Sequence, residues 1–361
     1  MFPVTHNSKP IVIIGCGQSG SAAARAVLDA GLRPLVLEAG PRPAGSWPAY
    51  YDSLRVFSPA RFSRIPGFRP FEGDPDRYPA RDEIAAYLEA FAAGLNAEIR
   101  THTPAVDVTV DGDVYTVHTA TGEAIEAAGV VAASGSFANP VRPRFPGQDE
   151  FTGRLVHAAD YREPGPFAGK RVVVVGAGNS AVQIACELAH HATVTLASRA
   201  PLTLVEQRPG GKDLHHALAA GFDHLPAEWF ARFLPGRLAI DTGGYQDAFD
   251  QGLLDRQPLF TAFEGDELVW GDGSREPVDA VIFATGYRPH LPYLASLGAL
   301  DEHGAPRHLG GISTTHPGLV YLGLEFQRSF ASNTLRGVAA DAAHVIEPLA
   351  AYARGAHIAL G

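Results

Sequence analysis

Two glycine-rich turns, each directly after a short apolar run, constrain the fold of this chain more than any other feature. The first is GCGQSG at residues 15–20, after the run 11–14, and the second is GAGNSA at residues 176–181, after the run 171–175. A buried strand that ends in such a turn and continues as a helix is typical of a Rossmann-type unit. Two such turns predict two dinucleotide-binding units.

The first turn has every element of a dinucleotide fingerprint. Gly15 permits the tight turn, Gly17 lacks the Cβ that would exclude a pyrophosphate, and Gly20 allows the helix to pack closely on the strand. The N-terminus of the following helix, predicted over 18–30, offers free N–H groups to phosphate. Glu38 ends the next predicted strand and can accept hydrogen bonds from ribose hydroxyls.

The second turn differs at two positions. Ala181 stands at the position of the third glycine, which affects only the packing of helix on strand. No acidic residue ends the following strand. Ser198 and Arg199 stand there instead. A guanidinium can pair with a 2′-phosphate, whereas a carboxylate would repel it, so this site favours NADP over NAD. An exposed surface arginine is the alternative explanation.

The first site is expected to bind FAD, because two nicotinamide nucleotides in one chain would have no partner chemistry. Residues 41–80 form a long loop without clear periodicity, which in a compact domain is usually functional. Ser46 and Trp47 lie in this loop, and the indole can cover an isoalloxazine ring. A tryptophan that only packs the loop explains the sequence equally well.

The predicted cofactor-binding residues are Gly15, Gly17, Gln18, Ser19, Gly20, Glu38, Ser46, Trp47, Val106, Gly176, Gly178, Asn179, Ser180, Ser198, Arg199, Thr285 and Gly286. No catalytic residue and no metal site is predicted. The pair His215-His216 lacks a third ligand nearby. Ser180 is not part of a G-x-S-x-G elbow, so it is not expected to be a nucleophile.

Composition excludes several classes of protein. The formal charge of −10 argues against a nucleic-acid surface and a polybasic membrane patch. The two cysteines, Cys16 and Cys186, form neither a CxxC pair nor a disulfide framework, which favours a reducing compartment. With neither a signal peptide nor an apolar stretch of spanning length, a cytoplasmic location is expected.

The order of the segments predicts one unit inserted into another. The runs VVAASG at 130–135 and VIFATG at 281–286 are alike, and each follows a glycine turn. We therefore expect an α/β fold of two Rossmann-type dinucleotide-binding domains with three-layer ββα architecture. The FAD domain would comprise 1–150 and 285–361, with the NADPH domain, 151–284, inserted into it.

Several other elements are predicted. An antiparallel meander is expected around 105–119 and a helix over 81–93. Segment 201–258 is expected to be irregular, 259–270 a short hairpin, and 319–322 a last strand. The final helix is expected over 331–353, kinked at Pro348. Its N-terminus near Ser332 is a candidate to stabilise reduced flavin.

The residues between the two turns resemble a family signature. Phe151-x-Gly153-x3-His157-x3-Tyr161 is similar to the fingerprint of the class B flavoprotein monooxygenases of the flavin-containing kind, and FATGY at 283–287 resembles their second signature. Segments 45–61 and 327–330 look most like a bacterial subgroup linked to arsenic-resistance operons. The chain lacks the longer Baeyer–Villiger form of the signature, which disfavours ketone oxygenation.

The resemblance implies a reaction. FAD and NADPH would be the cofactors, and one oxygen atom of O2 would pass through a C4a-(hydro)peroxyflavin to a soft nucleophile, an S, N or As centre of a small molecule. In this family, the position of His157 supports the nicotinamide domain and linker. The family's asparagine at flavin and nicotinamide has no clear equivalent, and Ser58 or Arg61 is expected in that region.

Two other functions fit the residues. The first is an NADPH-dependent flavoprotein reductase or oxidase that passes electrons to a quinone, a protein or O2. The second is a non-catalytic redox-sensing flavoprotein. A homodimer is compatible with the sequence, which does not determine the oligomeric state.

Overall fold

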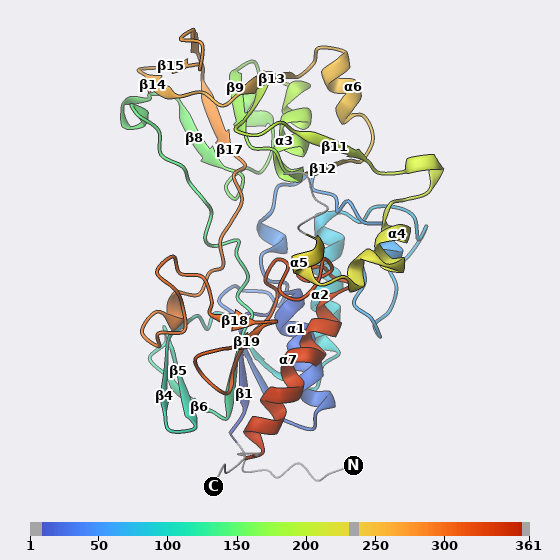
Figure 1. Cartoon of the computed structure of the whole chain (residues 1–361), viewed down its shortest axis with the longest axis vertical. Helices are drawn as coiled ribbons and strands as arrows, with labels where there is room; N and C mark the ends of the chain where they lie inside the picture. Colours follow the sequence, from blue (N-terminus) through green and yellow to red (C-terminus); the bar gives the residue numbers. More distant parts are fainter. Residues whose placement is uncertain (1–8, 231–237, 356–361) are drawn as a thin grey trace.

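The computed structural model describes residues 9–230 and 238–355 and has two sheet-bearing halves. Figure 1 shows them one above the other, joined by two crossing segments. Strands of the larger sheet come from both ends of the chain, and those of the other main sheet come from the middle. We call residues 9–150 and 285–355 the outer part, and the described residues of 151–284 the inserted part.

The outer part is built on a seven-stranded sheet in the order β18-β19-β20-β7-β1-β2-β3. Its central strands are short, apolar and buried on both faces, as a parallel sheet covered on both sides requires. The strands are β1 (Ile11–Ile14), β2 (Pro34–Leu37), β3 (Glu98–Arg100), β7 (Gly129–Ala132), β18 (His308–Leu309), β19 (Ile312–Ser313) and β20 (Leu319–Tyr321).

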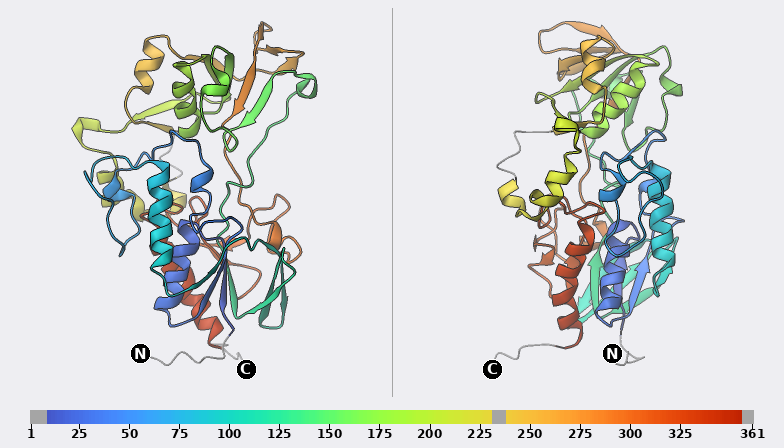
Figure 2. Two further views of the ribbon diagram at one scale, coloured as in Figure 1. Left: turned by 180° about the vertical axis from the view of Figure 1, so that it is seen from behind. Right: turned by 90° about the vertical axis from the view of Figure 1, so that its right-hand side faces the viewer.

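Two different layers cover this sheet. Helices α1 (Gln18–Asp29), α2 (Arg81–Ala93) and α7 (Val338–Ala353) lie on one face. The antiparallel meander of β4 (Ala105–Asp111), β5 (Val114–Thr119) and β6 (Ala124–Ala127) lies on the other, where its apolar side chains pack on β1 and β7 (Figure 2). This arrangement is the predicted three-layer ββα fold.

The inserted part repeats the motif on a five-stranded parallel sheet, β13-β10-β9-β17-β8. The strands are β8 (Arg154–His157), β9 (Arg171–Val175), β10 (Thr193–Ser198), β13 (Asp255–Pro258) and β17 (Ala280–Phe283), and α3 (Asn179–Ala189) follows the second glycine turn. The two-Rossmann fold class predicted from the sequence is therefore confirmed. The domain boundaries stay predictions.

Segment 201–258 is less regular, as expected, although residues 231–237 lie outside the described residues. Its helices are α4 (His215–Ala220), α5 (Ala227–Phe230) and α6 (Tyr245–Asp250). The sequence did not predict its small parallel sheet of β11 (Thr203–Glu206) and β12 (Leu238–Asp241).

The hairpin expected at 259–270 is present as the antiparallel pair β14 (Ala262–Glu264) and β15 (Glu267–Val269), and a third strand, β16 (Arg275–Pro277), extends it to a small sheet. One expectation is wrong. The last helix, α7, begins at Val338 and not near Ser332. The Ser332 hydroxyl accepts the N–H groups of Arg328 and Ser329 and fixes a turn there instead. The helix continues through Pro348, and the predicted kink stays a prediction.

Candidate functional site: two glycine turns and the aromatic contacts between them

The first glycine turn is held by backbone contacts that only glycine permits. Gly15 has a φ of +103°, and a Cβ there would lie 2.5 Å from the carbonyl oxygen of Ala133, after β7. A Cβ on Gly20 would lie 1.8 Å from the Gly15 carbonyl oxygen. Helix and strand thus meet as the fingerprint requires.

The middle glycine of this turn faces a second glycine in the long loop. A Cβ built on Gly45, whose φ is +56°, would lie 2.7 Å from the Cα of Gly17. The side chain of Trp47, two residues on, donates from Nε1 to Gln18 Oε1 over 3.3 Å. The structure therefore brings Trp47 to the first turn, and the predicted contacts of Ser46 and Trp47 with a cofactor stay predictions.

Glu38 lies beside the same turn and is buried. Its carboxylate accepts the N–H groups of Cys16 and Gly40 over 2.6 and 2.7 Å, which leaves lone pairs for ribose hydroxyls. The Glu38 carbonyl accepts the N–H of Thr103 over 2.8 Å and so brings the start of β4 close. Val106, three residues further, is half-exposed on that strand.

The loop before α7 completes the surroundings of the first turn. Gln18 Nε2 donates to the carbonyl of Asn333 over 2.9 Å, and Asn333 has a left-handed φ of +64°. A Cβ on Gly323 would lie 2.2 Å from the hydroxyl of the buried Ser19. The segment around Ser332 therefore does lie at this turn, although as a loop and not as a helix N-terminus.

The second turn repeats the geometry of the first. Gly176 has a φ of +152°, and its Cβ would lie 2.5 Å from the carbonyl oxygen of Ala284, after β17. Ala284 thus takes the position that Ala133 has in the outer part, in agreement with the likeness of the runs 130–135 and 281–286. A Cβ on Gly178 would meet nothing within 4 Å. The space beside Gly178 is therefore open, whereas a Cβ on Gly17 would lie 3.5 Å from the Cα of Gly45. Neither middle glycine carries a side chain that would exclude a pyrophosphate, so the residues fit two dinucleotides.

The remaining predicted residues of the inserted part divide into two groups. Ser198 and Arg199 stand at the end of β10, and Arg199 is exposed. In the part of the chain that the structure describes, no ion pair engages Arg199. Asn179 Oδ1 accepts the N–H of Ile240 over 2.8 Å, and Ser180 follows it in the first turn of α3.

Thr285 and Gly286 belong to the connection between the two parts. The Thr285 hydroxyl donates to the carbonyl of Val141, and the N–H of Val141 donates to the carbonyl of Gly286 over 2.9 Å. The two crossing segments are therefore hydrogen-bonded to each other. Gly286 has a φ of +84°, at the bend that leaves β17.

A series of aromatic contacts runs from the first turn to this connection. Adjacent ring centroids are separated by 5.7 Å for Trp47–Tyr50, 4.7 Å for Tyr50–Phe137 and 5.4 Å for Phe137–Tyr287. His157 packs edge-on against Tyr287 at 5.2 Å. Neither Tyr50 nor Phe137 was among the site residues predicted from the sequence. The signal was present, since an aromatic residue follows the glycine of each repeat, as GSF at 135–137 and GY at 286–287.

The signature of residues 151–161 serves packing. Phe151, His157 and Tyr161 are buried, and a Cβ on Gly153 would lie 2.3 Å from the Phe151 ring. The Tyr161 hydroxyl donates to Glu187 on α3 over 2.8 Å. These four positions fix the start of the inserted part against its own sheet and, through Tyr287, against the connection.

His157 gives this packing a pH dependence. Its Nδ1 accepts the N–H of Ala159 over 3.0 Å, so the neutral ring carries its proton on Nε2, which has no hydrogen-bond partner. Burial, with a smaller contribution from Arg142, lowers the pKa of His157 from 6.5 to about 4. The unfolded chain therefore binds a proton between these values that the folded chain does not, and stability falls as pH falls through this range.

Because of His157, we expect the free energy of unfolding to be about 2 kcal/mol lower at pH 5 than at pH 7. In His157→Gln, the fall in melting temperature between pH 7 and pH 5 should be smaller than in the wild type by about 4 °C. The matched control is the solvent-exposed His303→Gln. An identical pH dependence in His157→Gln and wild type would contradict the assignment.

Thiol and metal chemistry find no support in the described residues. Burial raises the pKa of Cys16 to about 11 and that of Cys186 to about 12, and both thiols are free. Within residues 9–230 and 238–355, no group of three potential metal ligands gathers. His215 bonds to Asp213, and His216 packs on Phe62.

No helix of the described chain is long and apolar enough to cross a membrane.

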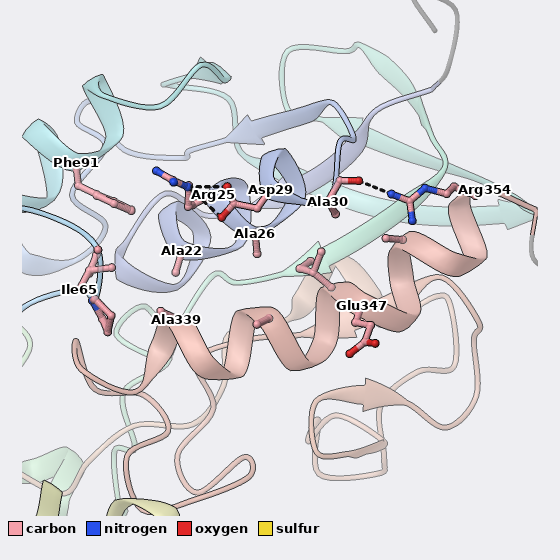
Figure 3. Close-up of a pocket in the computed structure, with 15 residues that line it drawn as sticks. Ala22, Arg25, Ala26, Asp29, Ala30, Ile65, Phe91, Ala339, Glu347 and Arg354 are labelled. Carbon is pink, nitrogen blue, oxygen red and sulfur yellow. Dashed lines mark hydrogen bonds and ion pairs between the residues drawn. The ribbon is translucent and has the colours of Figure 1, made fainter. Parts of the chain in front are cut away.

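One surface pocket lies apart from the glycine turns. Figure 3 shows it between α1 and α7, with Ala22 and Ala26 on α1 facing Ala339 on α7, and Arg25, Asp29 and Glu347 among its labelled charged residues. Its volume is about 530 Å³. It shares no residue with the predicted cofactor-binding set, so the candidate site remains the region between the two turns.

Comparison with known proteins identifies the class. Residues 12–210 match the model of the pyridine nucleotide-disulphide oxidoreductase family, to which this chain belongs. The solved flavin-containing monooxygenase from Stenotrophomonas maltophilia is 30% identical, with a TM-score of 0.83 over 95% of this chain and 98% of that one. The predicted NADPH-dependent flavin monooxygenase, with FAD and NADPH as cofactors, is thereby confirmed.

Two curated relatives are similarly close. An uncharacterized CzcO-like oxidoreductase of Geobacillus kaustophilus is 29% identical over 94% of this chain and 97% of its own length. The rice indole-3-pyruvate monooxygenase YUCCA1 is 29% identical over 78% of this chain and 77% of its own length.

Proposed function

We propose that this chain uses NADPH and O2 to insert one oxygen atom into a soft nucleophile, a sulfur, nitrogen or arsenic centre of a small molecule. Bound FAD supplies electron transfer from NADPH and the activation of O2. The arsenic option rests on the sequence resemblance alone. The likeness to a flavin-containing monooxygenase supports the reaction class.

The observation that carries the proposal is the aromatic series from Trp47 to Tyr287. It runs from the first glycine turn to the crossing segments, and its four side chains are partly buried. Oxygen transfer needs a site from which water is excluded, because peroxide is otherwise released. A reductase that passes electrons to a soluble acceptor has no such requirement.

The chain's own residues have distinct roles in this proposal. Gly15, Gly17 and Glu38 bind the phosphates and a ribose of FAD, and Gly178 leaves space for those of NADPH. Arg199 pairs with the 2′-phosphate. Because Cys16 is a buried, protonated thiol, no dithiol relay competes for the electrons.

The test is a substrate panel with the purified yellow protein. NADPH oxidation is followed with a thioether, a tertiary amine, a trivalent arsenical and, because one relative is named for it, indole-3-pyruvate, with peroxide measured in parallel. For one of the first three, NADPH consumed should equal product formed, while peroxide falls. Turnover with indole-3-pyruvate alone would contradict the soft-nucleophile class.

The other outcomes point to the alternatives. Peroxide equal to NADPH with every compound, together with rapid reduction of a quinone, would indicate a reductase or oxidase. Absence of NADPH oxidation with all of them would indicate a non-catalytic flavoprotein.

A further inference from the structure

The buried carboxylate of Asp213 joins the two parts of the molecule, and it lies far along the chain from the crossing segments. Asp213 Oδ2 accepts the hydroxyl of Tyr78 and the side-chain N–H of Gln207, each over 2.7 Å. Its Oδ1 accepts the backbone N–H and Nδ1–H of His215, each over 2.9 Å. Tyr78 belongs to the outer part, and the other three residues belong to the inserted part.

The same residues make further contacts across this boundary. Gln207 Nε2 donates its second hydrogen to the carbonyl of Phe57 over 2.9 Å. The His215 ring lies 6.1 Å from the rings of both Phe57 and Phe62. The boundary is therefore closed by a hydrogen-bonded carboxylate surrounded by aromatic rings, with Asp213 and His215 almost fully buried. We call Tyr78, Gln207, Asp213 and His215 the latch.

The neighbouring segment is fastened independently. Arg336 forms a two-point ion pair with Asp223 over 2.6 and 2.9 Å, and both side chains are largely buried. Pro226 forms an isolated bridge with Ser329. Loss of the latch should therefore loosen one boundary without releasing the whole inserted part.

The latch also contains an unsatisfied group. Gln207 Oε1 is buried and has no hydrogen-bond partner among the described residues. Both hydrogens of the amide nitrogen are used, and they fix the orientation of the side chain. A buried carbonyl without a partner is penalised relative to one in water. Opening of the latch would hydrate this oxygen, so the closed contact is held by the Asp213 hydrogen bonds against an opposing contribution.

We propose that Asp213 is a positioning residue. Through the latch, it sets the position of the inserted part, which carries the NADPH turn, relative to the outer part, which carries the FAD turn. In the reaction proposed above, on which this part of the role rests, Asp213 keeps the region between the turns closed to water.

Hydrogen exchange of the FAD-loaded protein tests the latch without turnover. In Asp213→Asn and in the milder Tyr78→Phe, amides of both 55–80 and 205–218 should exchange about tenfold faster, because loss of one buried hydrogen bond favours local opening by about this factor. The matched control is Tyr115→Phe, which removes a buried hydroxyl that donates to Pro317 within the outer part, over 2.6 Å. Faster exchange in only the segment that carries the substitution would overturn the latch.

The second readout concerns the reaction. With a productive substrate, or with NADPH and O2 alone if none is found, Asp213→Asn and Tyr78→Phe should raise the rate of peroxide formation at least threefold over wild type and Tyr115→Phe. Unchanged peroxide despite faster exchange in both segments would overturn the positioning role. Because exchange is measured without NADPH, failure of the oxygenase proposal would leave that result readable.

Discussion

Gly20→Ala is expected to yield a protein that is strongly destabilised and contains little FAD. The added Cβ would lie 1.8 Å from the backbone oxygen of Gly15, and neither backbone segment can shift without separating α1 from β1. Overpacking against fixed backbone places the cost at about 3 kcal/mol or more. Flavin absorbance per mole of protein and the melting temperature measure the two effects.

Gly178→Ala is the matched comparison, because its Cβ would meet no protein atom within 4 Å. This variant should keep its FAD and melt within about 2 °C of the wild type, since it creates no cavity and no clash. Its KM for NADPH should rise, because the methyl group occupies the space assigned to the pyrophosphate. Equal FAD loss in both variants would show that the two turns do not bind different cofactors.

Arg199→Ala is expected to raise the KM for NADPH about tenfold or more while the KM for NADH changes less than about twofold. A hydrogen bond between charged groups contributes about 1.5–3 kcal/mol, and only NADPH has the 2′-phosphate to make it. Steady-state kinetics with both nucleotides give the comparison.

Arg275→Ala controls for the loss of a surface charge, since Arg275 is 55% exposed and pairs with Glu264 in the small antiparallel sheet. It should leave both KM values unchanged. If Arg199→Ala raised the KM for NADH as much as that for NADPH, the 2′-phosphate assignment would be wrong.

The features that sequence analysis predicted correctly are local. Each glycine turn, its strand and its helix lie within about 30 residues, and their periodicity and backbone requirements can be read directly. The repeat at 130–135 and 281–286 was also readable, and the structure places Ala133 and Ala284 at equivalent positions beside Gly15 and Gly176.

The features that were missed depend on distant partners. Tyr78 donates a hydrogen bond to Asp213, and Tyr50 packs on Phe137. No local sequence pattern indicates either contact. The start of α7 was missed for a related reason. A Cβ on Gly337 would lie 2.1 Å from the carbonyl of Ala331, so the chain before the helix is folded back on itself, which apolar spacing alone does not reveal.

Turnover under ¹⁸O2 with NADPH and the best substrate of the panel tests the monooxygenase reaction most directly. We expect a product that carries one ¹⁸O atom for each NADPH consumed, as measured by mass spectrometry. Product without label, or label found only in peroxide and water, would contradict a monooxygenase.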